Sequence, residues 1–193
     1  MYVVLFIVLS LALGISAMLL MRRCAEAVPI QLSSGVLVSF TTAVVHVALF
    51  CLGIYLGNKL QFVADGDPTA YARQNSLAFL GLAVVVAAKQ LLPYLGRRNQ
   101  PAAYDLNAGT LQVLLFTFAT GINGFLLGFG VGFVVSLSGY LHAALWPLFL
   151  MTFLFSVLGI MFGRQQVPLR SRRWMGLSSL IVFMTALCTV LFL

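Results

Sequence analysis

The stretch that decides the fold is Ala119-Thr-Gly-Ile-Asn-Gly-Phe-Leu-Leu-Gly128, which repeats the N-terminal stretch Ala12-Leu-Gly-Ile-Ser-Ala-Met-Leu-Leu20. Five of ten positions are identical when the alignment starts at residues 11 and 118. The one clearly polar position in each copy, Ser16 or Asn123, falls at the same place. Because both copies lie midway along apolar runs, we interpret them as a duplication that sets two half-sites facing each other.

The composition excludes a soluble globule. Of 193 residues, 62% are hydrophobic and only 8% are charged, which leaves too little polar surface for water. Each of six apolar runs has about the 20 residues that a helix needs to cross about 30 Å of hydrocarbon. We therefore predict an all-α polytopic membrane protein with six transmembrane helices. The runs are 2–21, 34–57, 76–96, 109–135, 141–163 and 174–193.

The charges limit the expected binding partners, and the cysteines limit the expected disulfide and metal chemistry. The net charge is +7, but the basic residues lie at the ends of the apolar runs and not among stacking aromatics, so the expected partner is the lipid bilayer and not nucleic acid. The three cysteines are widely spaced and form no C-x-x-C pattern, so we expect buried thiols and neither a disulfide framework nor a zinc site.

The arginines predict the orientation. Eight basic residues follow the first, third and fifth runs, against Lys59 and Arg73 on the other side. Positive charge accumulates in cytoplasmic loops, so we place both termini outside. The eight are Arg22, Arg23, Arg97, Arg98, Arg164, Arg170, Arg172 and Arg173.

Three runs precede the second copy of the repeat, so the fourth run enters from the opposite side to the first. The halves are therefore predicted to be inverted repeats. A second match supports this: residues 52–57 and 158–163 agree at four of six positions. We expect a first repeat at 1–98, a cytoplasmic linker at 99–108 and a second repeat at 109–193.

Glycines recur one turn apart in three runs. Small residues at this spacing let helices cross closely, and we predict helix packing at these positions. Close-packed small faces also serve as the sliding surfaces of transporters, and the sequence leaves that alternative open. The glycines are Gly53, Gly57, Gly124, Gly128, Gly132, Gly159 and Gly163.

Polar residues share these faces. Ser39, Thr42 and His46 form a stripe on the second run, and Thr152 and Ser156 form one on the fifth. The imidazole of His46 either ligates a metal or passes a proton, or it makes a single interhelical hydrogen bond. At Ser16 and Asn123, either the helix is broken to expose its carbonyls, or a continuous span holds one bonded side chain.

Lys89 is the one charge inside a run. It lies seven residues before the cytoplasmic end, close enough for its ammonium to reach water along the surface; the alternative is a lysine that faces an anionic substrate. The four acids all fall in predicted loops, at Glu26, Asp65, Asp67 and Asp105. A hard divalent cation would meet no carboxylate in the spans, and we find no pattern of an enzyme or a cofactor site.

The residues Gly14-Ile-Ser-Ala17 and Ala119-Thr-Gly-Ile-Asn-Gly124 resemble the paired first-span and fourth-span motifs of the MntP-type manganese efflux pump family, within the LysE-like exporters. The runs ending at Gly57 and Gly163 resemble its second and fifth spans, and Lys89 matches a basic residue of its third. The resemblance implies an exporter in a bacterial cytoplasmic membrane. The family has metal-binding aspartates where this chain has Ser16 and Asn123, so the metal is left unknown.

Three hypotheses follow. The first is an exporter that moves a small solute or cation, such as manganese, by alternating access around Ser16, Thr42, His46, Thr120 and Asn123. The second is a transport-inactive membrane subunit or scaffold, whose glycine faces bind partner helices and whose cytoplasmic arginines dock anionic lipid or an acidic protein. The sequence leaves a homodimer and a partner membrane protein open as assemblies. The third is an amino acid exporter in which Lys89 receives the carboxylate.

Overall fold

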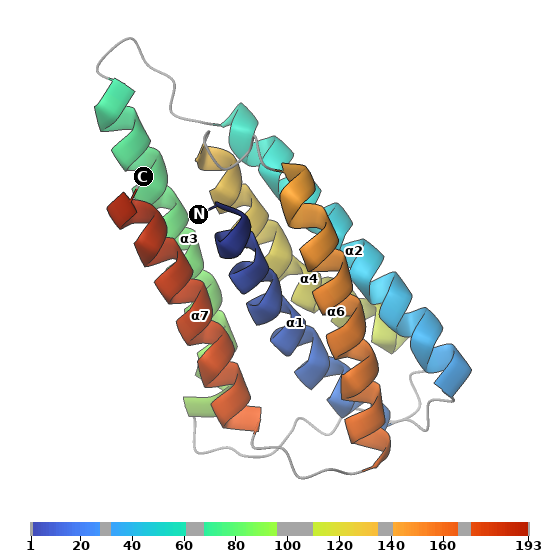
Figure 1. Cartoon of the computed structure of the whole chain (residues 1–193). Helices are drawn as coiled ribbons and strands as arrows, with labels where there is room; N and C mark the ends of the chain where they lie inside the picture. Colours follow the sequence, from blue (N-terminus) through green and yellow to red (C-terminus); the bar gives the residue numbers. More distant parts are fainter. Residues whose placement is uncertain are drawn as a thin grey trace.

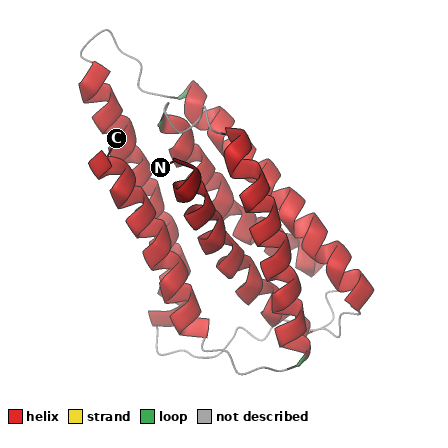
Figure 2. Ribbon diagram, in the orientation of Figure 1, coloured by secondary structure: helices red, strands yellow, loops and turns green. Residues whose placement is uncertain are grey.

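The chain is a bundle of six helices in a computed structural model that describes residues 2–27, 32–60, 68–95, 110–134, 141–165 and 171–192. Figures 1 and 2 show that these parts are helical almost throughout, which confirms the predicted all-α membrane fold. The helices are α1 (Tyr2–Ala27), α2 (Leu32–Lys59), α3 (Pro68–Leu95), α4 (Thr110–Phe133), α6 (Leu141–Arg164) and α7 (Ser171–Phe192).

The helices have the length and polarity of transmembrane spans. Within the described residues, α1, α2, α3, α6 and α7 are each long and apolar enough to cross a bilayer. Helix α4 has 24 residues, and the stretch Thr120–Phe133 within it is an apolar helix. Large apolar side chains also point away from the bundle: Trp146 is 70% exposed and Leu37 is 67% exposed. An apolar outer surface suits a hydrocarbon solvent.

Helices α1 and α3 extend past their apolar runs by more than one helical turn. The prediction that Arg22, Arg23 and Glu26 lie in a loop is wrong, because α1 continues to Ala27. An ion pair one turn apart, Arg22 Nε to Glu26 Oε1 at 2.7 Å, lies in this polar extension. Helix α3 begins at Pro68, eight residues before its apolar run, and proline suits the first turn of a helix because its missing N–H has no partner there. The predicted linker 99–108 lies outside the described residues.

The helix contacts have the symmetry of an inverted repeat. The extensive pairs are α1 with α6, α2 with α4, and α3 with α7. In an inverted repeat, α1 corresponds to α4, α2 to α6 and α3 to α7. Under this correspondence the α1–α6 pair becomes the α4–α2 pair, and the α1–α7 pair becomes the α4–α3 pair. Both products are pairs in contact, and α2–α6, α3–α7 and α1–α4 map onto themselves. In Figure 1 both chain ends lie at the same end of the bundle, as an even number of crossings requires.

The glycines confirm the register of the repeat. A methyl group added at Gly53 would meet the carbonyl of Phe125, and one at Gly159 would meet the carbonyl of Met18. The offset between Met18 and Phe125 is 107 residues, the offset that aligns Ser16 with Asn123. The next turn repeats the relation, with Gly57 against the carbonyl of Phe129 and Gly163 against that of Arg22.

Helix packing is therefore the role of most of the predicted glycines. Gly128 and Gly132 of α4 approach the carbonyls of Phe50 and Ile54 in α2. Gly124 differs, because a methyl group there would lie 3.6 Å from the carbonyl oxygen of His46, at ordinary contact distance. The α2–α4 seam is thus glycine-lined on both sides.

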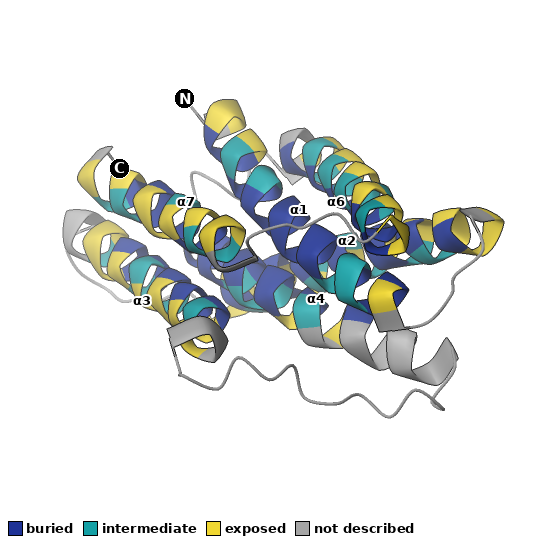
Figure 3. Cartoon of the chain, turned by 90° about the horizontal axis from the view of Figure 1, so that it is seen from below, coloured by how far each residue is buried: buried dark blue, intermediate teal, exposed yellow. Residues whose placement is uncertain are grey.

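Helix α1 occupies the centre of the bundle. It is the most buried of the described spans, and Figure 3 shows its buried face enclosed by neighbouring helices. Phe6, Leu9 and Leu13 of α1 share the main apolar cluster with Phe79 of α3 and Leu127 of α4.

Candidate functional site

The mainly apolar interior of the bundle holds a set of polar side chains, and those that the structure describes are uncharged. Among the described residues, the buried polar side chains carry hydroxyl groups, amides and one imidazole, and none is Asp, Glu, Lys or Arg. In hydrocarbon each such group needs a partner inside the protein or a bound molecule. The set is Ser10, Ser16, Ser39, Thr42, His46, Asn75, Ser76, Gln90, Thr117, Asn123, Thr152, Ser156, Ser178, Ser179, Thr185 and Thr189.

One part of this set is a closed network, which we call the serine–glutamine cluster: Ser16 of α1, Gln90 of α3, and Ser178 and Ser179 of α7. Gln90 Nε2 donates to Ser16 Oγ at 3.0 Å. The carboxamide oxygen of Gln90 lies 3.2 Å from Ser179 Oγ, which donates to it, and 3.1 Å from Ser178 Oγ. The four side chains are at most 3% exposed.

The single hydroxyl proton of Ser178 faces two acceptors. Ser178 Oγ lies 2.8 Å from the carbonyl oxygen of Ala12 and 3.1 Å from Gln90 Oε1, and both of these oxygens can only accept. Ser178 has one hydroxyl proton, so it is shared or alternates between them. Ser16 Oγ lies 3.3 Å from Ser178 Oγ and can donate to it. The cluster ties α1 and α3 of the first half to α7 of the second.

A second group lies on the α2–α4 seam and comprises Thr42, His46, Thr117 and Thr120. Thr42 Oγ1 donates to the carbonyl of Val38 at 2.8 Å, and Thr117 Oγ1 lies 3.3 Å across the seam from it. Thr120 Oγ1 donates to the carbonyl of Thr117 at 3.0 Å. The group lines the seam with hydroxyls, and these are partly used in bonds to their own helices.

The hydrogen bond of His46 fixes its tautomer. His46 Nδ1 lies 2.9 Å from the carbonyl oxygen of Thr42, and the residue is 1% exposed. Since a carbonyl can only accept, Nδ1 carries the proton, and in a neutral imidazole Nε2 is left with the lone pair. This bond lies within α2. Through Nδ1, therefore, His46 does not make the interhelical hydrogen bond that was one of its two predicted roles.

Asn123 belongs to neither group. It is 6% exposed, and its Oδ1 atom has no hydrogen-bond partner in the described part of the chain. The buried hydroxyls of Ser39, Thr152 and Ser156 share this property. Leaving a buried polar group without a partner costs about 1–3 kcal/mol, so native proteins keep few of them. Together with Asn75 Oδ1, which shares the property, these four oxygens are where the described part of the bundle can still receive a hydrogen-bonding guest.

The predicted site residues are therefore distributed over two groups and one open acceptor. Thr42 of α2 contacts Thr117 of α4 across the seam, while Ser16 bonds to α3 and α7. No hydrogen bond between Ser16 and Asn123 is found among the described residues. Helices α1 and α4 are continuous at these two positions, so the broken-helix alternative does not describe this conformation.

The sequence did not identify Gln90, Ser178 and Ser179 as interior residues. Gln90 drew notice only as the neighbour of Lys89, yet Gln90 is 3% exposed and Lys89 lies on the outer surface. This placement agrees with a lysine that extends along the surface to water. The available signal was the serine pair at 178–179, two adjacent hydroxyls within an otherwise apolar run.

The described residues offer oxygen ligands without carboxylates. No group of three or more His, Cys, Asp or Glu side chains that could hold a metal ion is found among them. The three cysteines are free. The prediction of buried thiols is right for Cys24 and wrong for Cys188, which is exposed because it faces outward from α7.

The fold and its interior define a class: an all-helical, multi-pass membrane protein whose buried polar side chains, among the described residues, are uncharged. No family model, no curated protein and no solved structure matches the chain.

Proposed function

We propose that the protein is a membrane transporter that moves a small solute outward by alternating access and binds it through uncharged hydrogen-bonding groups. The observation that carries the proposal is the amide of Asn123. It is buried, it has an open acceptor, and it lies at the repeat equivalent of Ser16, whose hydroxyl is fully bonded. Polar groups buried in membrane spans are costly and mark solute pathways.

The unequal partners of Ser16 and Asn123 fit one end state of an inverted-repeat transporter. In such proteins the two halves exchange conformations when access switches from one side to the other. Here the serine–glutamine cluster holds α1 against α3 and α7, while Asn123 of α4 has no equivalent bond. In the opposite state Asn123 gains partners and the cluster around Ser16 opens.

The chemistry of the interior favours a neutral solute or a weakly hydrated cation over manganese. Hard divalent cations prefer carboxylate and water oxygens, and the buried polar side chains of the described residues are all uncharged. If the chain retains the framework of a manganese exporter, aspartates at positions 16 and 123 should restore manganese binding. We therefore expect the double variant Ser16→Asp, Asn123→Asp to gain manganese flux that the natural chain lacks.

Two other functions have less support. A scaffold that binds partner helices through its glycine faces would leave those faces open, yet Gly53, Gly57, Gly159 and Gly163 pack on helices of the same chain. An amino acid exporter that uses Lys89 would turn this side chain inward, yet Lys89 is exposed. Alternating access around Asn123 requires neither open glycine faces nor an inward-facing Lys89.

The test is solute flux from liposomes that contain the purified chain. Vesicles are loaded in turn with manganese, sodium, a neutral polyol and a zwitterionic amino acid, and efflux is compared for the natural chain, Asn123→Leu and Ser16→Ala. Asn75→Leu is the matched control for Asn123→Leu, because Asn75 is also 6% exposed with an unpartnered Oδ1. We expect flux of at least one solute to fall in the site variants and to persist in the control. Equal flux in all four proteins would remove the proposed site.

A further inference from the structure

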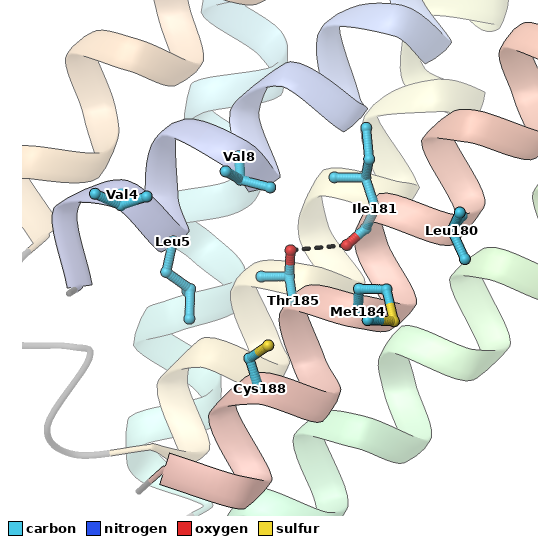
Figure 4. A pocket seen from close by; sticks show the side chains of 8 residues that line it. All are labelled: Val4, Leu5, Val8, Leu180, Ile181, Met184, Thr185 and Cys188. Carbon is cyan, nitrogen blue, oxygen red and sulfur yellow. Dashed lines mark hydrogen bonds between the residues drawn. The ribbon is translucent and has the colours of Figure 1, made fainter.

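An apolar groove of about 520 Å³ follows the seam between α1 and α7 (Figure 4). It has the volume of an ordinary small-molecule site, but no residue of the serine–glutamine cluster and no residue of the α2–α4 group lines it. Among the residues that the structure describes, no charged side chain lines it. The lining residues are Val4, Leu5 and Val8 of α1 with Leu180, Ile181, Met184, Thr185 and Cys188 of α7.

The groove has a buried floor and exposed rims. Leu5 and Thr185 are 8% and 6% exposed, whereas Val4 and Leu180 on the rims are 62% and 57% exposed. The hydroxyl of Thr185 donates to the carbonyl of Ile181 at 2.7 Å, so the one hydroxyl in the lining is already used. The groove therefore opens sideways, out of the bundle, and offers its contents a hydrocarbon surface.

The length of the groove along the helix axes matches the thickness of one leaflet of a bilayer. Its walls lie within the candidate spans Val3–Glu26 and Arg173–Leu191. From Leu180 to Cys188 a helix rises about 12 Å, close to half of a hydrocarbon core of about 30 Å. Beyond Val8 and Ile181 the seam closes, because Ser178 Oγ bonds to the carbonyl of Ala12 at 2.8 Å.

We propose that this groove binds one acyl chain of a bilayer lipid, in the leaflet at the end of the bundle that carries both termini. Water does not fill apolar cavities of this kind. A second copy of the chain is a poor occupant, since eight side chains line the groove and a typical interface uses about 20–30 residues a side. An acyl chain fits the depth, the sideways opening and the absence of charge, and it occupies the space between α1 and α7 where their own side chains do not meet.

Photochemical labelling tests the proposal on the full-length chain. The protein is placed in phosphatidylethanolamine–phosphatidylglycerol vesicles with a trace of a phospholipid that carries a diazirine midway along one acyl chain. Labelled residues are mapped by mass spectrometry. We expect labelling of residues 4–8 and 180–188 to exceed, several-fold, that of equally exposed apolar residues on outer faces. Val85 of α3 and Leu154 of α6 are the matched positions, at 54% and 52% exposure.

A groove-filling variant keeps the test specific. Val8→Phe should abolish the excess labelling at residues 180–188, while Val85→Phe should leave it unchanged. Labelling that simply follows exposure would mean ordinary boundary lipid and would overturn the proposal. Photochemical cross-links from the groove to a second copy would overturn it in favour of a dimer contact. Since neither outcome involves flux, the result is independent of the transport proposal.

Discussion

Replacing Gly53 by alanine should destabilise the bundle, because the α2–α4 seam has no room for a methyl group. The added carbon would lie 2.7 Å from the backbone nitrogen of Phe129 and would overlap the carbonyl oxygen of Phe125. Ordinary contact begins at 3.4 Å, so the helices must separate by at least about 0.7 Å to clear this nitrogen, and by more to clear the carbonyl oxygen of Phe125. A gap of about 0.5–1 Å forfeits a quarter to a half of the attraction between packed atoms. We expect a loss of about 1–3 kcal/mol, the usual cost of overpacking.

The repeat supplies the companion measurement. Gly159→Ala should cost a similar free energy of unfolding, because its methyl group would lie 3.0 Å from the carbonyl carbon of Met18 on the equivalent seam. Gly81→Ala is the control, since nothing lies within 4 Å of the added carbon; it should be neutral or gain up to about 1 kcal/mol from helix propensity. Unfolding in bicelles by steric trapping gives the three values. If Gly53→Ala and Gly81→Ala cost the same, the packing argument is refuted.

Three further predictions concern the interior. Gln90→Ala should lower the free energy of unfolding by about 1–3 kcal/mol by leaving cluster hydroxyls unpaired, whereas Gln74→Ala, on the exposed face of the same helix, should change it by less than about 0.5 kcal/mol; equal losses would contradict the cluster. Asn123→Leu should leave stability unchanged or raise it, since it removes an unpartnered acceptor; a large loss by the same assay would mean that the amide is structural. Gly124→Ala should be tolerated, unlike Gly53→Ala, because its methyl group would lie at 3.6 Å; comparable unfolding losses would show that the seam is tighter than described.

The sequence predicts the helices, and it predicts the register of the equivalent α2–α4 and α1–α6 seams. The lengths of the apolar runs indicate six spans, and the alignment of Ser16 with Asn123 carries over to the contacts of Gly53 and Gly159. This succeeds because glycine spacing records where two backbones touch. The match between residues 52–57 and 158–163 adds the partner helices.

The sequence could not predict which polar side chains meet. Gln90 bonds to Ser16, 74 residues away, and Ser178 bonds to the carbonyl of Ala12, 166 residues away. Helices α3 and α7 share little sequence, so their relative rotation is set by packing and no repeated motif indicates it. The boundary of α1 was missed for a simpler reason: an apolar run marks the part of a helix in hydrocarbon and not its polar last turn.

Alternating access around Asn123 is the central claim, and thiol labelling tests it without knowledge of the solute. Asn123→Cys is made in a chain whose natural cysteines are replaced, and a membrane-impermeant thiol reagent is added to oriented vesicles from one side or the other. Although the side chain is 6% exposed in this conformation, the account predicts modification from each side, as the two access states exchange. A cysteine at position 123 that stays unreactive from both sides would contradict it.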